Sequence, residues 1–112
     1  MTKVQYASPP LACNLTALGS EERAAHQALT AKLFRSAQSV ERLPNGLALR
    51  FPNETPTLRR LADFIANEER CCPFLTFDIR VEPQKAELRL SITGTRSISR
   101  FIKAEFADLM KS

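Results

Sequence analysis

The sequence predicts an α+β domain, in which helices cover one face of a four-stranded, mostly antiparallel sheet. Two segments with the apolar spacing of a helix are each followed by a pair of short segments in which apolar and polar residues alternate. The two pairs, RLPNGLALRF and RVEPQKAELRL, look like versions of one hairpin, which indicates a repeated helix–strand–strand unit. The expected order is therefore αββ-αββ-α.

A single domain is expected, because a chain of 112 residues can bury one core without disulfide bonds. Its parts are a lead-in loop (1–19), two αββ units (20–54 and 55–95) and a C-terminal helix (96–112). From about Ser97, that last helix is expected to bury Ile98, Phe101, Ile102 and Leu109.

The first unit opens at Ser20, a favourable N-cap residue, and Glu21 and Glu22 suit the positive end of a helix dipole. The apolar side of this helix carries Leu29, Leu33 and Ala37. Asn45-Gly46 then marks a hairpin between SVERL and LALRF, because Asn-Gly favours tight turns between strands.

The second unit opens at Thr55, since a capping residue followed by Pro56 is typical of a helix start. The apolar side of its helix carries Leu58, Leu61, Ala62 and Ile65. Its strands meet at a turn around Pro83-Gln84, and their inward residues are expected to be Leu75, Phe77, Ile79, Val81, Leu88, Leu90 and Ile92.

Composition and charge exclude few partners. Hydrophobic residues make up 44% and charged residues 25%, and the net charge of +4 permits anionic partners without requiring them. No apolar run approaches the length of a membrane span. Three cysteines, an odd number without regular spacing, do not fit a disulfide-stapled secreted domain. We therefore expect a cytoplasmic protein with reduced thiols and no membrane association.

Cys71 and Cys72 stand together where the second helical pattern ends at Pro73. If the two αββ units correspond, Ser36 and Ala37 occupy the same places in the first unit, so the architecture does not require the cysteine pair. One interpretation is plain packing, because a free cysteine behaves as a small hydrophobic residue and Cys72 falls on the core side of an ideal helix. Proline after Cys72 also favours an extended conformation there.

The other interpretation is that the two thiols react as nucleophiles or bind a metal ion. The helix C-terminus disfavours a thiolate, and the charges of Arg70, Glu68 and Glu69 are mixed, so a strongly activated nucleophile is not indicated. A metal ion would deprotonate the thiols directly. Adjacent thiolates match the usual zinc spacing poorly and suit thiophilic ions such as copper(I), mercury(II) or arsenic(III).

Two further residues are candidate metal ligands. Cys13 lies in the lead-in loop, and we expect it close to the Cys71-Cys72 junction because the apolar residues around it gain free energy by docking on the core. His26 lies on the first helix and is expected to face the interior of the protein. Glu22, one turn earlier on the same helix, is expected to hold one nitrogen of its ring. The candidate metal ligands are Cys13, His26, Cys71 and Cys72.

The motifs ERCCPF and CNLTALGSEERAAH resemble those of a group of short, uncharacterised bacterial proteins, and the similarity covers most of the chain. The resemblance implies that one set of positions belongs together: Cys13, Asn14, Leu15, His26, Glu68, Arg70, Cys71, Cys72, Pro73 and Phe74. Glu69 departs from the pattern, since a basic residue is expected there. The resemblance implies no activity.

The leading hypothesis is a small protein that binds a soft metal or metalloid ion through these cysteines, as a sensor, carrier or sequestering module. One alternative is a thiol-based redox or transferase enzyme, with Cys71 as the more exposed attacking thiol and Cys72 or Cys13 as the resolving thiol. A second alternative is a protein-interaction module with structural cysteines. Nucleic acid is not expected as a partner, because the outward strand residues Asp78, Arg80, Glu82, Glu87 and Arg89 have mixed charges.

Overall fold

The computed structural model describes residues 15–95, together with residues 100, 102 and 104. In chain order its elements are η1 (Leu15–Ala17), α1 (Ser20–Ser36), β2 (Ser39–Leu43), β3 (Gly46–Pro52), α2 (Thr55–Cys71), β4 (Thr76–Glu82), η2 (Pro83–Lys85) and β5 (Glu87–Thr93). Most of the expected lead-in and C-terminal helix lies outside the described residues. Ile102, which is helical and buried, agrees with the expected last helix.

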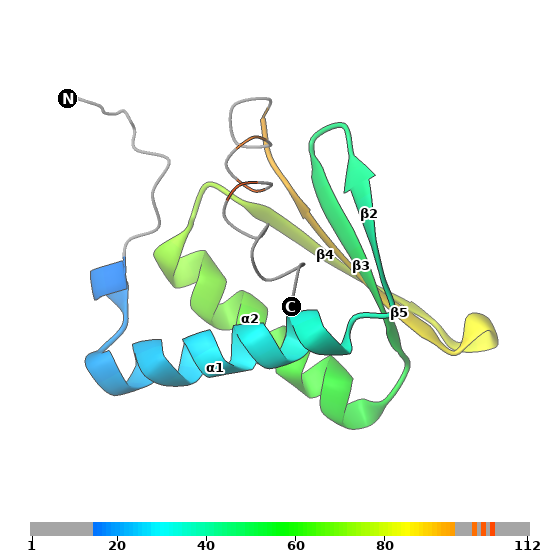
Figure 1. Cartoon of the computed structure of the whole chain (residues 1–112), viewed down its shortest axis with the longest axis horizontal. Coiled ribbons are helices and arrows are strands. Elements are labelled where there is room, and N and C mark those ends of the chain that lie inside the picture. The colour runs from blue at the N-terminus through cyan, green and yellow to red at the C-terminus, as the bar shows by residue number, and fades with distance from the viewer. Residues whose placement is uncertain (1–14, 96–99, 101, 103, 105–112) are drawn as a thin grey trace.

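The four strands form one antiparallel sheet in the order β2-β3-β5-β4. Each hairpin therefore contributes one edge strand, and the second strands of the two hairpins pair at the centre. Helices α1 and α2 lie side by side and cover the same face of the sheet (Figure 1). The α+β class and the antiparallel sheet predicted from the sequence are confirmed.

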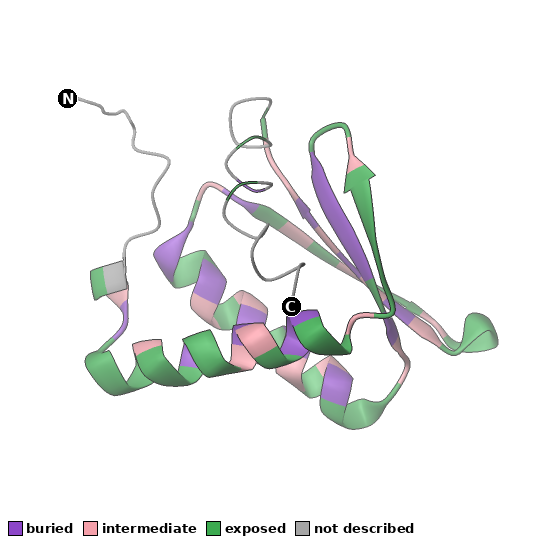
Figure 2. Ribbon diagram, in the orientation of Figure 1, coloured by how far each residue is buried: buried purple, intermediate pink, exposed green. Residues whose placement is uncertain are grey.

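The core lies between the two helices and the inner face of β3 and β5. Figure 2 shows the buried residues on these facing surfaces. Fully or almost fully buried strand residues are Leu47, Leu49, Phe51, Leu88, Leu90 and Ile92, and their helix partners include Leu33, Phe34, Leu61 and Phe64. The edge strand β2 is exposed except for the half-buried Leu43, so the helices cover the centre of the sheet more than this edge.

The first hairpin uses its glycine differently from the expected Asn-Gly turn. Strand β2 ends at Leu43 and β3 begins at Gly46, so the two turn residues are Pro44 and Asn45. No described glycine has a positive φ. A Cβ on Gly46 would lie 1.9 Å from the carbonyl oxygen of Ile92 on β5. Glycine is needed here because two strands approach closely, not because the turn is left-handed.

Both helices begin one residue from the expected cap. Gly19, rather than Ser20, is the N-cap of α1, and its N–H donates to Glu22 Oε1 at 3.1 Å. Glu54, rather than Thr55, is the N-cap of α2, with Pro56 in the first turn as expected. Neither helix in the described ranges is long and apolar enough to cross a membrane.

The ends of the two helices correspond. Each helix has 17 residues; α1 ends at Ser36 with Ala37 as its C-cap, and α2 ends at Cys71 with Cys72 as its C-cap. Ser36 and Ala37 therefore stand at the end of α1 where Cys71 and Cys72 stand at the end of α2, although two residues connect α1 to β2 and four connect α2 to β4. The fold does not explain why α2 ends in a pair of thiols.

Candidate functional site

The buried stripe of α2 leads to a thiol. Its residues are Thr57, Leu61, Phe64, Glu68 and Cys71. Steps of three or four residues keep them on one side of the helix, toward α1 and the core. Glu68 is part of this stripe, so its carboxylate is buried, and the residue is only 8% exposed. A buried carboxylate requires a partner.

That partner is His26 of α1. His26 Nε2 lies 2.5 Å from Glu68 Oε2, and both residues are buried. Phe64, one turn before Glu68, stacks against the imidazole with ring centroids 5.6 Å apart. The other ring nitrogen, Nδ1, is buried and has no hydrogen-bond partner in the described part of the chain. The pair therefore fixes the ring and leaves Nδ1 available.

Glu22 does not hold His26, so that expectation was wrong. Glu22 Oε2 instead pairs with Arg70 Nη1 at 3.2 Å, and Arg70 Nη2 donates to the carbonyl oxygen of Ala17 at 2.9 Å. The Gly19 N–H, and then Arg70, hold the pKa of the Glu22 carboxyl below its ordinary value. Spacing within α1 favoured Glu22, but α2 packs on the same side and supplies a nearer carboxylate.

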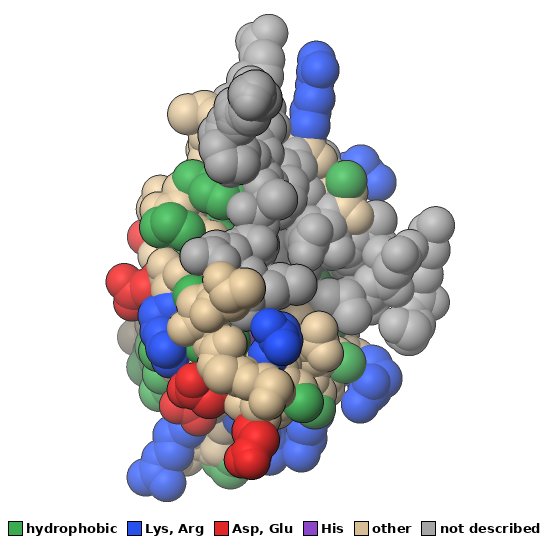
Figure 3. All heavy atoms as spheres, turned by 90° about the vertical axis from the view of Figure 1, so that its left-hand side faces the viewer, with side chains coloured by type: hydrophobic (Ala, Val, Ile, Leu, Met, Phe, Trp, Pro, Cys, Tyr) green, Lys and Arg blue, Asp and Glu red, His purple; other side chains and the backbone are tan. Residues whose placement is uncertain are grey.

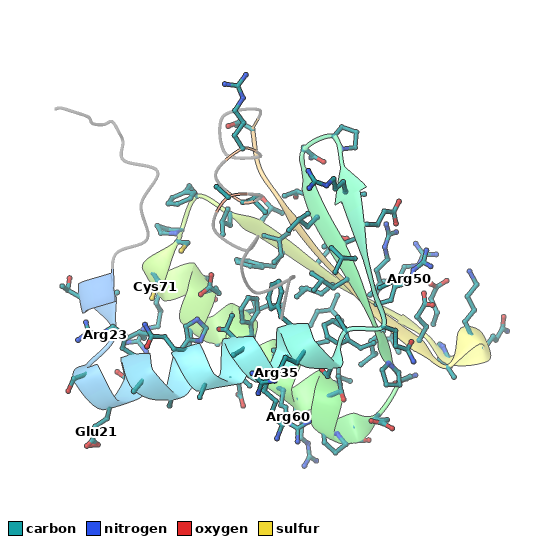
Figure 4. All side chains as sticks on the ribbon, in the orientation of Figure 1. Glu21, Arg23, Arg35, Arg50, Arg60 and Cys71 are labelled. Atoms are coloured by element: carbon teal, nitrogen blue, oxygen red, sulfur yellow. The ribbon has the colours of Figure 1, made fainter. Side chains whose placement is uncertain are left out.

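Cys71 is a buried, free thiol on the last turn of α2. In Figure 4 it lies at the end of the molecule that also carries Glu21 and Arg23 of α1. Burial, and then the nearby Glu68 carboxylate, raise the pKa of the Cys71 thiol, while Arg70 opposes them. Cys71 is 2% exposed and Cys72 is 0% exposed, so Cys71 is the more exposed of the two, although both are buried.

The surroundings of this thiol are charged but balanced. Figure 3 looks onto the same end of the molecule and shows acidic and basic side chains close together on its surface. Such a mixed field does not by itself lower a thiol pKa, in agreement with the upward shift at Cys71.

Cys72 caps α2 and is fully buried. Its φ of −129° and ψ of 69° place it outside the extended region, so the extended conformation expected before Pro73 is not adopted, and its N–H donates to the Glu68 carbonyl oxygen at 2.6 Å. The sulfur of Cys72 is disulfide-bonded, whereas Cys71 is free. The two neighbours therefore differ in chemical state, and the expectation of reduced thiols holds for Cys71 but not for Cys72. Cys13, the remaining cysteine of the sequence, lies outside the described residues.

The structure describes three of the four predicted metal ligands. His26, Cys71 and Cys72 all lie buried near the junction of α1 with the end of α2. Within the described ranges, no three His, Cys, Asp or Glu side chains are arranged to hold a metal ion. The four-ligand set that includes Cys13 stays a prediction.

Glu68 is the residue that sequence reasoning undervalued. On a helical projection Glu69 also falls near the apolar residues Leu58 and Ile65, but Glu69 is exposed. The signal for Glu68 was its position seven residues after Leu61 and four after Phe64, which continues the apolar stripe. An acidic residue on such a stripe predicts a buried partner on another element.

Comparisons of the chain with protein-family profiles, curated proteins and solved structures gave no match. The function proposed for the chain therefore depends on the contacts of Glu68, His26 and the two adjacent cysteines.

Proposed function

We propose that the chain binds a soft metal or metalloid ion through Cys71 and Cys72 after reduction of the Cys72 disulfide, with Cys13 as third ligand and His26 as an optional fourth. One observation carries this proposal: Cys72 is bonded to another sulfur while Cys71, beside it, is free. The sequence contains one further cysteine, Cys13, and we propose that it is the partner of Cys72. Reduction would then release two thiols, which with the free thiol of Cys71 make three.

The state of Cys71 favours a ligand over a nucleophile. A buried thiol with a raised pKa reacts slowly as a free nucleophile. A bound cation removes that obstacle because it displaces the proton and stabilises the thiolate. The burial that weakens a nucleophile therefore protects a metal–thiolate bond from competing water.

His26 is suited to the fourth position. Metal-binding histidines usually hold the second ring nitrogen against a carboxylate or carbonyl, which fixes the tautomer and the ring orientation. Glu68 holds Nε2 in this way, and Nδ1 has no partner among the described residues. The imidazole would turn toward the thiols only as far as its stacking on Phe64 allows.

The donor set favours soft ions. Two or three thiolates and at most one imidazole suit copper(I), mercury(II) or three-coordinate arsenic(III), and zinc is the harder competitor. A sensing, carrying or sequestering role in the cytoplasm, as a member of the bacterial group suggested by the sequence motifs, completes the proposal.

Titration of the reduced protein tests it. Copper(I), mercury(II), arsenite and zinc are added separately, and free thiols are counted at each step. We expect loss of three reactive thiols at one equivalent of a soft ion, and loss of one fewer in Cys13→Ser, Cys71→Ser or Cys72→Ser. Ser36→Ala, at the matching end of α1, is the control and should behave as wild type. Three free thiols at stoichiometric metal would overturn the proposal.

A thiol-based redox function is the second candidate, because a disulfide next to a free thiol is the arrangement from which exchange starts. In such exchange the Cys71 thiolate attacks the disulfide sulfur of the partner cysteine, Cys72 leaves as the new thiol, and no net oxidation occurs. Turnover of a small disulfide with glutathione, lost in Cys71→Ser, would favour this candidate. Equal turnover in wild type and Cys71→Ser would exclude it.

A further inference from the structure

A cavity of about 350 Å³ lies beside the exit of α2. It is lined by Ile65, Glu69, Pro73, Leu75, Thr76 and Phe77. These residues come from the last turns of α2, the connecting loop and the start of β4. The described residues that line it include neither Cys71 nor Cys72, although Pro73 follows Cys72 directly. Its volume is at the low end of the range for small-molecule sites.

Polar and apolar groups share the walls of the cavity, and its apolar side chains are firmly supported. Leu75 is buried at 8% exposure, and Phe77 packs edge-on against Phe64 with ring centroids 6.2 Å apart. Phe64 is itself fully buried in the core. The aromatic wall is therefore held in place by the core and does not need a ligand to order it.

Glu69 is the one charged side chain among the described residues that line this space. In the described ranges its carboxylate takes part in no ion pair, although most acidic side chains on the sheet surface do. Thr76 adds a hydroxyl that can accept or donate a hydrogen bond. A carboxylate and an aromatic face together recognise an organic cation, the first by charge and the second by its quadrupole.

We infer that this cavity binds a small organic ammonium ion with an apolar body. The ammonium group pairs with Glu69, and the apolar body lies against Ile65, Leu75 and Phe77. The small volume favours a free molecule over a segment of a partner protein. The inference is independent of the metal site, since it requires neither a reduced thiol nor a bound ion.

Phenethylammonium is a suitable probe, with 2-phenylethanol as the neutral analogue and 3-phenylpropanoate as the anionic one. Binding is followed by the NMR shifts of the Thr76 and Phe77 backbone amides in the protein as isolated, without metal. We expect saturable shifts with a Kd of about 1 mM for the cation, a reasonable affinity for so small a ligand. The alcohol should bind several times more weakly and the carboxylate not at all.

Two variants separate the effect of the Glu69 charge from the effect of any change of charge on α2. Glu69→Gln should weaken binding of the cation about threefold to fivefold, as expected for one partly exposed ion pair. Asp63→Asn removes another exposed charge from α2 outside the cavity and should leave the Kd unchanged. Equal affinity for cation and anion, no saturable shift, or an unchanged Kd in Glu69→Gln would each overturn the inference. None of these outcomes bears on metal binding by the thiols.

Discussion

Glu68 links three parts of the site. Its carboxylate contacts His26 Nε2, its backbone carbonyl accepts the N–H of Cys72, and its charge contributes to the raised pKa of Cys71. A substitution of its side chain therefore affects the imidazole and the Cys71 thiol together, whereas the backbone hydrogen bond to Cys72 does not depend on the side chain. The neighbouring Glu69 is exposed and provides a comparison in the same turn of helix.

A double-mutant cycle measures the buried pair. His26→Ala and Glu68→Ala should each lower the free energy of unfolding by about 2–4 kcal/mol, because each leaves a buried polar partner unsatisfied. The double variant should cost clearly less than the sum, since neither partner then remains. Urea unfolding provides the measurement. Glu69→Ala should change stability by less than about 0.5 kcal/mol, and additive single effects would contradict a direct interaction.

The pH dependence of Cys71 follows from its raised pKa. Burial and Glu68 keep the thiol protonated in the folded protein, so alkylation by iodoacetamide should reach half its maximal rate at a higher pH than in the urea-unfolded chain. The contribution of this group to stability is complete below the ordinary thiol pKa and is lost as pH rises toward the folded value. Mass spectrometry identifies the alkylated cysteine.

Glu68→Gln tests the smaller of the two causes of the raised Cys71 pKa, which is the Glu68 charge. Removing the carboxylate charge should move the alkylation midpoint of Cys71 down, but not to the unfolded value, because burial is the larger cause. Glu69→Gln is the matched control and should leave the midpoint where it is. A midpoint at or below that of the unfolded chain would mean that Cys71 is an activated thiol, and would favour the redox candidate.

The hairpins show how strand pairing constrains individual residues. Gly46 begins β3 opposite Thr93 of β5, and the neighbouring residue, Leu47, lies opposite Ile92. The space for a Cβ at Gly46 is taken by backbone atoms of Ile92 and Thr93, which cannot move without breaking the pairing of the central strands. One small residue therefore allows the two hairpins to join.

Gly46→Ala should destabilise the protein by about 3 kcal/mol or more, because the new methyl group meets backbone and not a flexible side chain. Gly19→Ala is the control: the nearest atom to its Cβ is Glu22 Oε1 at 3.7 Å, and the expected cost is below about 1 kcal/mol. Thermal unfolding followed by circular dichroism compares them. Similar melting temperatures for Gly46→Ala and wild type would show that β3 and β5 can separate without cost.

Elements could be predicted from the sequence where the signal is local. Alternation placed the strands, and Pro56 placed the start of α2 within one residue. The role of Gly46 was not predictable in this way, because the obstructing atoms belong to a strand far along the chain. The same holds for the pairing of His26 with Glu68, which depends on how α1 packs against α2. Local patterns thus indicated the elements and the thiol pair, whereas contacts between elements required the structure.

At the scale of the whole molecule, the face of the sheet opposite the helices does not form a positive platform. Arg50, Arg89 and Arg80 lie side by side on β3, β5 and β4. Their ion pairs on this face include Arg89–Glu41 at 3.1 Å, Arg80–Glu82 at 3.5 Å and Arg50–Glu87 at 3.7 Å. These carboxylates compete with phosphate for the guanidinium groups, and the absence of a nucleic-acid partner stays a prediction.

The disulfide of Cys72 should affect the stability of the whole molecule. If the partner is Cys13, as proposed, the bond closes a loop that contains α1, the first hairpin and α2. Closing a loop of this size reduces the entropy of the unfolded chain, and reduction should lower the free energy of unfolding by about 4 kcal/mol. Urea unfolding of oxidised and reduced protein measures the difference.

Three variants identify the cysteines that are responsible for the change in stability on reduction. In Cys13→Ser and Cys72→Ser, reduction should no longer change the unfolding midpoint, whereas Cys71→Ala should keep the full difference because Cys71 is free. A soft metal ion should then restore stability to the reduced wild type, since an ion that binds only the folded state stabilises it in proportion to the logarithm of its concentration. If Cys13→Ser responds to reduction as wild type does, Cys13 is not the partner of Cys72, and the three-thiol site cannot form as proposed. The expected result is that reduction has no effect in either serine variant and that metal restores stability to the reduced wild type alone. The disulfide and the metal site would then use the same sulfurs and would be mutually exclusive states of one protein.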